Sequence, residues 1–79
     1  MDEAIQQRLT AIFRTVFDEP DLQLRRAMTA HDVPAWDSLS HITLIVAVER
    51  EFRVRFTTAE VAALMNVGDL ADQISKKLS

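Results

Sequence analysis

A serine at the predicted start of a helix is the residue in this sequence best placed for chemistry. Ser38 follows Asp37, and an apolar-periodic run that is typical of a helix begins directly after the pair. An aspartate in front of such a run is a good N-cap, because its carboxylate accepts hydrogen bonds from the free backbone N–H groups of the first turn. The same turn carries a partial positive charge, which favours a phosphate ester on a neighbouring hydroxyl. The spacing therefore predicts that the Ser38 hydroxyl is exposed and suited to phosphorylation or to a phosphodiester link.

Other interpretations of this segment stay open. His41 lies one helical turn after Ser38, so a serine–histidine nucleophile pair is one alternative. The sequence argues against it, because it offers no third orienting residue and no glycine-rich oxyanion hole. Ser38 can also be an ordinary first-turn serine. We expect His41 on the surface, packed on Trp36 across the cap, and Trp36 half-buried as a plug for the preceding loop, with a platform for a bound group as the alternative.

The composition excludes several classes of site and of protein. The 79 residues include no cysteine, one glycine and two histidines, which excludes disulfides, thiolate metal sites, glycine-rich phosphate loops and a zinc site, so we predict no metal. Nine basic against twelve acidic residues give a net charge of −3, which argues against a nucleic-acid-binding protein. Apolar runs are short and the N-terminus is acidic, so we expect no membrane span, no signal peptide and a cytoplasmic location. The length predicts a single domain over residues 1–79.

The hydrophobic pattern predicts an all-α fold, a four-helix bundle with a long loop between the first two helices and a short third helix. The first helix ends near Phe17 or Asp18, because Pro20 follows. A connection over about 18–37 leads to a second, broadly apolar helix that runs to Phe52. This connection is long for a bundle, so we expect it to be anchored in the core by apolar side chains. The candidates are Leu22, Leu24, Met28 and Val33.

Two further helices are predicted in the last third of the chain. The pair Thr57-Thr58 is a plausible cap for a short helix over about 59–64. Asn66 is a candidate cap for a last helix that extends to Leu78. The residues from Phe52 to Phe56 alternate in polarity, but one strand has no partner, so we predict a loop pinned by its apolar side chains.

The short third helix is expected to be a weakly held element. It is rich in alanine, which buries little surface, so we predict fast amide exchange around 59–65. Met28 and Met65 are most simply gap fillers, with the soft lining of a cavity that admits variable chains as the alternative.

Asp37-Ser38-Leu39 in front of a broad apolar helix that closes with Glu49-Arg50-Glu51-Phe52 resembles the acyl carrier proteins. The resemblance covers nearly the whole chain, including its length, the long first connection and the short third helix. It implies that Ser38 takes a covalent 4′-phosphopantetheine arm from coenzyme A and that Leu39 contacts partner enzymes. It also implies that Asp37 caps the helix and helps the modifying enzyme's metal and coenzyme A to dock. The thiol of the arm would hold an acyl or aminoacyl group as a thioester, so the resemblance implies a carrier and not an enzyme.

The resemblance also implies partners, namely a phosphopantetheinyl transferase and enzymes that load and accept the acyl group. Carriers of fatty acid synthesis usually have several acids along the second helix, whereas here no acid appears before Glu49. This departure favours a stand-alone carrier of a specialised acyl or aminoacyl pathway, whose partner has a more apolar or mixed surface. We expect the carrier to be a monomer. Its candidate partner contacts are Trp36, His41, Ile42 and Arg50.

A second hypothesis is an unmodified helical interaction module that retains the carrier fold and binds a partner through the apolar second helix. The three arginines near the end of that helix, Arg50, Arg53 and Arg55, are most simply a solvated patch, with contact to a partner as the alternative.

Overall fold

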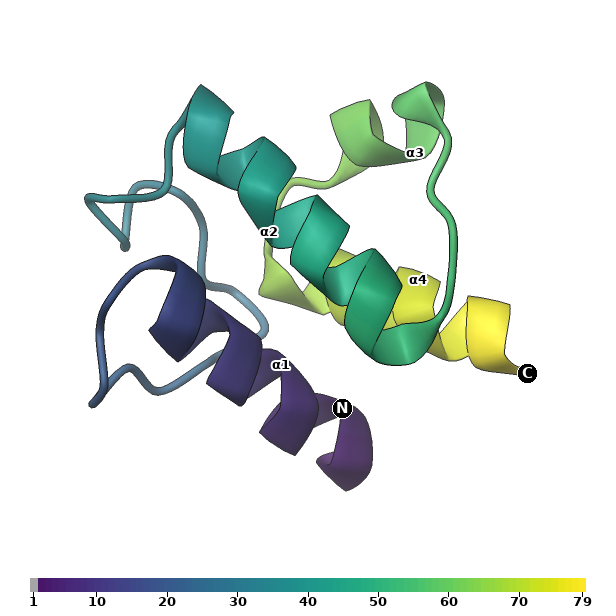
Figure 1. Ribbon diagram of the computed structural model, residues 1–79, viewed down its shortest axis with the longest axis horizontal. Coiled ribbons are helices and arrows are strands. Elements are labelled where there is room, and N and C mark those ends of the chain that lie inside the picture. Colours follow the sequence, from purple (N-terminus) through teal and green to yellow (C-terminus); the bar gives the residue numbers. More distant parts are fainter. Residues whose placement is uncertain (1) are drawn as a thin grey trace.

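The computed structural model describes residues 2–79, which form four helices joined by one long and two short connections (Figure 1). The helices are α1 (Glu3–Val16), α2 (Ser38–Phe52), α3 (Thr58–Ala63) and α4 (Val67–Leu78). In each case the side chain of a polar cap residue accepts an N–H of the first turn; the caps are Asp2, Asp37, Thr57 and Asn66. The predicted all-α, four-helix fold is confirmed, and the third helix lies one residue earlier than predicted.

α1, α2 and α4 enclose the apolar core, while α3 lies at its edge. α1 contacts both α2 and α4, and Figure 1 shows α3 on the side of α2 that faces away from α1. α3 buries no residue completely, and its Val61 is only partly buried against the core. The fold therefore depends on three helices. Their largest fully buried side chains are Leu9, Phe13, Leu44, Val48, Val67, Leu70 and Ile74.

The long connection between α1 and α2 follows the surface of this core and sends side chains into it. Three of the four predicted anchors, Leu24, Met28 and Val33, are buried, and Leu22 is half-buried. Burial of these side chains offsets the conformational entropy that is lost when a loop of this length is ordered.

The first turn of α4 anchors the middle of the same connection, a feature that the sequence analysis did not predict. The N–H of Val67 donates to the carbonyl of Met28 at 2.9 Å, and the N–H of Gly68 donates to the carbonyl of Arg26 at 2.9 Å. These bonds satisfy two of the N–H groups that a helix start leaves free. Arg26 also pairs with Asp72 through two hydrogen bonds of 3.1 and 2.8 Å. A Cβ at Gly68 would lie 3.2 Å from Arg26, so glycine permits this close approach.

The turn after α2 is pinned by its apolar side chains, as predicted. Phe52 and Val54 are buried, and the Glu49 carboxylate accepts the N–H of Phe56 at 2.9 Å. The C-cap residue Arg53 adopts the left-handed conformation, with φ 56° and ψ 47°. This conformation suits glycine better than a residue with a Cβ atom.

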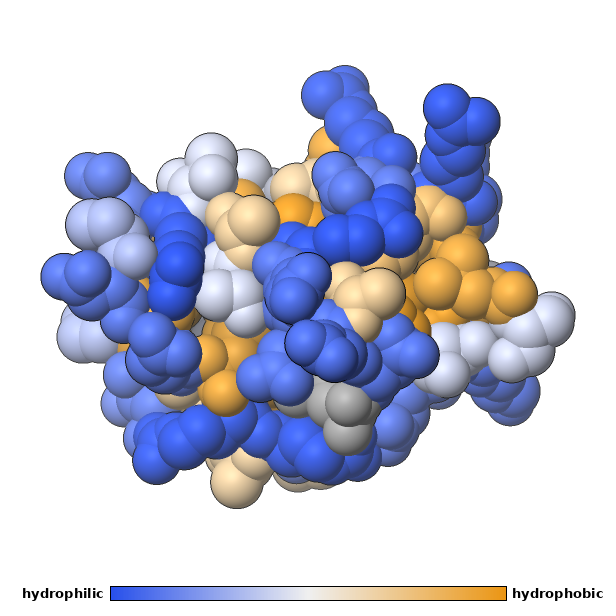
Figure 2. Space-filling model, turned by 90° about the horizontal axis from the view of Figure 1, so that it is seen from below, coloured by the Kyte–Doolittle hydropathy of each residue, from blue (hydrophilic) through white to orange (hydrophobic). Residues whose placement is uncertain are grey.

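Polar side chains cover much of the surface. Figure 2, which views the molecule from below, shows a mostly hydrophilic face with hydrophobic patches between the polar side chains. Among residues 2–79, no helix has the length and apolarity needed to span a membrane. The large apolar side chains that stay exposed are Leu39, Ile42, Val46, Met65 and Leu78.

Candidate functional site

Ser38 is the first residue of α2, and its side chain is exposed. Within residues 2–79 its hydroxyl takes part in no hydrogen bond, because Asp37 and Ser40 cap the helix between them. The hydroxyl therefore stands free at the electropositive end of a helix of 15 residues.

The cap around Ser38 is a reciprocal capping box. One oxygen of the Asp37 carboxylate accepts the N–H groups of Leu39 at 3.1 Å and Ser40 at 2.9 Å. The Ser40 hydroxyl oxygen accepts the N–H of Asp37 at 2.8 Å, and the hydroxyl donates to the carbonyl of Ala35 at 2.7 Å. The bonds from the Ser40 backbone and side chain lower the pKa of Asp37, so its carboxylate is ionised at neutral pH. The predicted cap is confirmed. The role of Ser40 was missed, although the Asp-x-x-Ser spacing of a capping box signals it.

Trp36 joins the end of the long connection to both α1 and α2. Its ring meets Phe13 edge-on, with 5.4 Å between ring centroids, and lies 5.9 Å from the ring of Phe17. Its Nε1–H donates to Nδ1 of His41 at 3.0 Å, and the two rings stack at 21°. The predicted half-buried Trp36 packed on His41 is confirmed. The expectation that His41 is exposed is wrong: its ring contacts Trp36, with 6.1 Å between ring centroids, and the residue is half-buried.

The arrangement does not activate Ser38 as a nucleophile. The His41 nitrogen that could accept a proton is already bonded to the indole of Trp36. In the described part of the chain no hydrogen bond links His41 to Ser38. The serine–histidine alternative therefore lacks the geometry that it requires.

A groove of about 460 Å³ opens beside Ser38. Trp36 and His41 lie on one wall, and the end of α3 with the turn after it forms the other wall. The groove is lined mainly by apolar side chains and can receive a slender group attached to Ser38. On the α3 side and in the loop the lining residues are Ala30, Val61, Ala62, Leu64 and Met65.

The two methionines behave differently from one another. Met28 is buried and fills the core as expected, but Met65 is 77% exposed at the rim of this groove. The prediction that Met65 fills a gap is wrong, because its backbone N–H bonds to the Asp69 carboxylate in the tight turn before α4, which leaves its side chain outside the core.

The predicted site residues separate into two groups. Leu39 and Ile42 are exposed on the outer side of α2, at 79% and 62%, and Arg50 is exposed farther along the helix. The residues that the structure gathers around the groove are Trp36, Asp37, Ser38 and His41.

Comparison with solved structures identifies a similar protein. The solution NMR structure of the holo acyl carrier protein of Geobacter metallireducens is 49% identical to this chain and superposes with a TM-score of 0.87. The match covers 92% of this chain and 84% of that one. No protein-family model and no curated protein matches the chain. Identity and coverage at this level confirm the resemblance noted in the sequence: the chain belongs to the acyl carrier protein family.

Proposed function

We propose that Ser38 carries a 4′-phosphopantetheine arm and that this arm holds an acyl or aminoacyl group as a thioester. The observation that supports the proposal is the exposed, unengaged Ser38 hydroxyl at the start of α2. The solved relative at 49% identity is a holo acyl carrier protein. Members of this family are carriers rather than enzymes, which agrees with a serine that has no neighbouring base.

The residues around Ser38 fit such a group. The helix start favours the negative charge of a phosphodiester, and the capping box of Asp37 and Ser40 does not use the Ser38 hydroxyl, so modification leaves the cap intact. In the transfer the Ser38 oxygen bonds to phosphorus, the pyrophosphate bond of coenzyme A breaks, adenosine bisphosphate leaves and the serine proton passes to a base of the transferase. The arm supplies a thiol, which this cysteine-free chain lacks.

The other predicted residues act by positioning or by contact. Asp37 holds the first turn of α2 in place for the transferase, and the exposed Leu39 and Ile42 offer apolar contacts to partner enzymes. Trp36 and His41 fix the wall of the groove next to the attachment point.

We also propose that the protein is a stand-alone, specialised carrier, with residues 1–79 acting as one domain and as a monomer. Its partners are a phosphopantetheinyl transferase and the enzymes that load and accept its acyl group. The absence of acidic residues in α2 before Glu49 supports a dedicated partner surface. A single core shared by α1, α2 and α4 supports one domain.

The test is the intact mass of the full chain after incubation with coenzyme A and several phosphopantetheinyl transferases. We expect the mass to rise by one phosphopantetheinyl group in the wild type and to stay unchanged in Ser38→Ala. Ser75→Ala is the matched control, because Ser75 is an exposed serine of α4 far along the sequence from the site, and it should be modified like the wild type. A folded wild type that no transferase modifies, or a modified Ser38→Ala variant, contradicts the proposal.

The unmodified interaction module is the competing hypothesis, and the exposed apolar face of α2 is the observation that favours it. It predicts that Ser38→Ala retains full biological activity in the native cell, whereas the carrier hypothesis predicts complete loss.

A further inference from the structure

An apolar stripe runs down the outer face of α2 from the attachment point. Leu39, Ile42 and Val46 are 79%, 62% and 41% exposed. Their spacings of three and four residues place them on one side of the helix. Arg50, four residues after Val46, continues the same stripe. The distance along the axis from Ser38 to Arg50 is about 18 Å, from the rise of an α-helix.

The far end of this stripe carries an excess of positive charge. Arg50, Arg53 and Arg55 are all exposed, and among residues 2–79 none of them forms an ion pair. With Val46, Val54 and the Glu49 carboxylate, these arginines line a hollow of about 470 Å³ at the end of α2, so three positive charges and one negative charge surround it.

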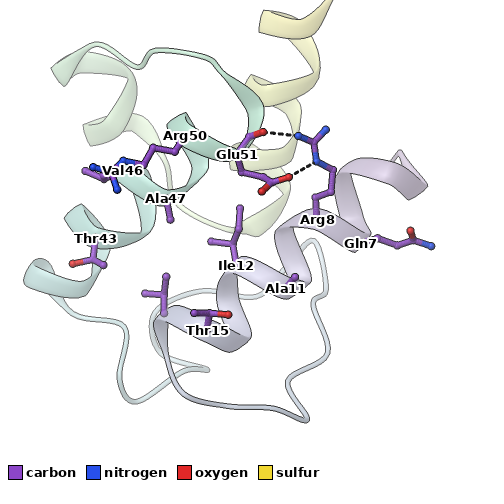
Figure 3. Close-up of a pocket in the computed structure, with 11 residues that line it drawn as sticks. Gln7, Arg8, Ala11, Ile12, Thr15, Thr43, Val46, Ala47, Arg50 and Glu51 are labelled. Atoms are coloured by element: carbon purple, nitrogen blue, oxygen red, sulfur yellow. Dashed lines mark hydrogen bonds and ion pairs between the residues drawn. The ribbon is translucent and has the colours of Figure 1, made fainter.

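Of the two acids next to these arginines in the sequence, one is paired with a cation and the other is bonded to a backbone N–H group. Glu49 accepts the N–H of Phe56, and Glu51 pairs with Arg8 of α1 through a 2.8 Å bond (Figure 3). α2 has no acid in its first eleven residues, Ser38–Val48. The stripe therefore joins an apolar half to a basic end, although the whole chain has a net charge of −3.

One arginine of the basic end, Arg53, has a strained backbone conformation. Arg53 occupies a left-handed position with φ 56°, where glycine is favoured and a side chain is strained. A side chain held in such a conformation is a reason to look for a role for its guanidinium.

The stripe also borders a shallow groove of about 700 Å³ between α1 and α2. Figure 3 shows Val46, Ala47 and Arg50 of α2 on one side of it and Ile12 and Ala11 of α1 on the other. The Arg8–Glu51 pair lies at the end near Arg50. This groove widens the apolar surface that a partner can cover.

We propose that the enzymes that exchange acyl groups with this carrier meet α2 through an acidic surface. That surface surrounds an apolar depression for Leu39, Ile42 and Val46, and its carboxylates lie about 18 Å from the point where the arm enters. This inference rests on the proposed function, because only a carrier needs to present Ser38 to such an enzyme. The charge sign excludes partners whose docking surface is basic, since like charges would meet at Arg50 and Arg53.

A protein is favoured over a nucleic acid or an anionic membrane as the occupant. Three arginines on a chain with net negative charge are too few for tight phosphate binding. A nucleic acid backbone would also leave the apolar stripe uncovered, whereas a protein surface matches both halves.

The test uses two helical peptides that share one leucine-rich face and differ only in having glutamate or lysine on their flanks. Binding to the ¹⁵N-labelled full chain is followed by amide chemical shifts. We expect the glutamate peptide to shift residues 39–55 of the α2 face and to bind about tenfold more tightly than the lysine peptide. The double variant R50E/R53E should reverse this preference. The matched control R25E/K76E, which changes two exposed cations outside the stripe, should leave it unchanged.

Three outcomes would overturn the inference: equal affinity for the two peptides, shifts away from α2, or the same α2 shifts with phosphatidylglycerol vesicles or single-stranded DNA. Circular dichroism checks that R50E/R53E is folded. The intact mass after treatment with transferase and coenzyme A is measured on the same samples. A modified Ser38 without peptide preference means that the inference fails and the carrier function stands, while an unmodified Ser38 means that the carrier function fails.

Discussion

The last two helices are neighbours in the sequence, yet the rest of the molecule holds them very differently. α4 buries five residues, and two N–H groups of its first turn bond to carbonyls of the long connection. α3 buries none. It is held by its own capping box, by the partly buried Val61, and by the ion pair from Glu60 to Lys77 of α4.

This difference shows how the groove beside Ser38 is built. One wall, formed by Trp36 and the cap of α2, is fixed by aromatic packing and a ring-to-ring hydrogen bond. The other wall is the end of α3, which few contacts restrain. We therefore expect the end of α3 to move more easily than Trp36 and the cap of α2, so that the groove can change width while the attachment point stays in place.

The largest expected effect comes from shortening one apolar side chain in α4 and one in α3. Leu70→Ala should lower the free energy of unfolding by about 2–5 kcal/mol, because Leu70 is 2% exposed and leaves a cavity in the core. Val61→Ala should cost only about 0.5–1 kcal/mol, since its side chain is partly exposed. Urea unfolding of both variants, followed by circular dichroism, measures the difference. Equal losses in the two variants would show that α3 is held as firmly as α4.

Amide hydrogen exchange should show the same contrast without any mutation. We expect the amides of α3 to exchange at least about tenfold faster than those of the middle of α4, because α3 can open without exposing the core. Exchange rates corrected for intrinsic chemistry, residue by residue, are the measurement. Strong and uniform protection across 58–63 would contradict the expected mobility of the end of α3.

Local signals in the sequence were enough to predict the helices and the cap at Ser38. The N-cap at Asp37, the hydrophobic periods and the position of Pro20 all act over a few residues, so each could be recognised from spacing alone. The packing of Trp36 on His41 was predicted for the same reason, since the two residues are five apart across one cap.

Contacts between distant segments could not be predicted in this way. The bonds from the start of α4 to Met28 and Arg26 join segments about forty residues apart in the chain, and no spacing rule connects them. The exposure of Met65 was missed because this residue lies between two helices, where helical periodicity does not indicate whether a side chain is buried. The positive excess around Arg50 became visible only when the structure showed that Glu51 pairs with Arg8 and that Glu49 is bonded to the backbone N–H of Phe56.

A smaller effect is expected when the strain at Arg53 is removed. Arg53→Gly should stabilise the fold by about 0.5–1 kcal/mol, because glycine adopts the left-handed conformation without the Cβ penalty. Amides of α4 that exchange through global unfolding should slow by about two- to fivefold, whereas those of α3, which open locally, should not. Arg55→Gly removes the same charge at a position without positive φ and should give no gain. Equal slowing in α3 and α4 would mean that both helices open in one global step.

The smallest effect concerns the ion pair between Glu60 of α3 and Lys77 of α4. The N–H of Thr57 and the Lys77 ammonium lower the pKa of Glu60 below its ordinary value of 4.5. A carboxylate with a lowered pKa stabilises the fold above the ordinary value, and this contribution disappears as the pH falls through the folded-state pKa. Glu60→Gln keeps the capping acceptor but removes the charge, so wild type should be the more stable protein at neutral pH, and the two should converge as the pH falls through the folded-state pKa of Glu60. Urea midpoints of both proteins across this range measure the gap. Asp72→Asn is the control, because it removes the charge that pairs with Arg26 and leaves the Glu60–Lys77 pair intact. We expect Glu60→Gln to speed the exchange of the α3 amides and Asp72→Asn to leave that exchange unchanged.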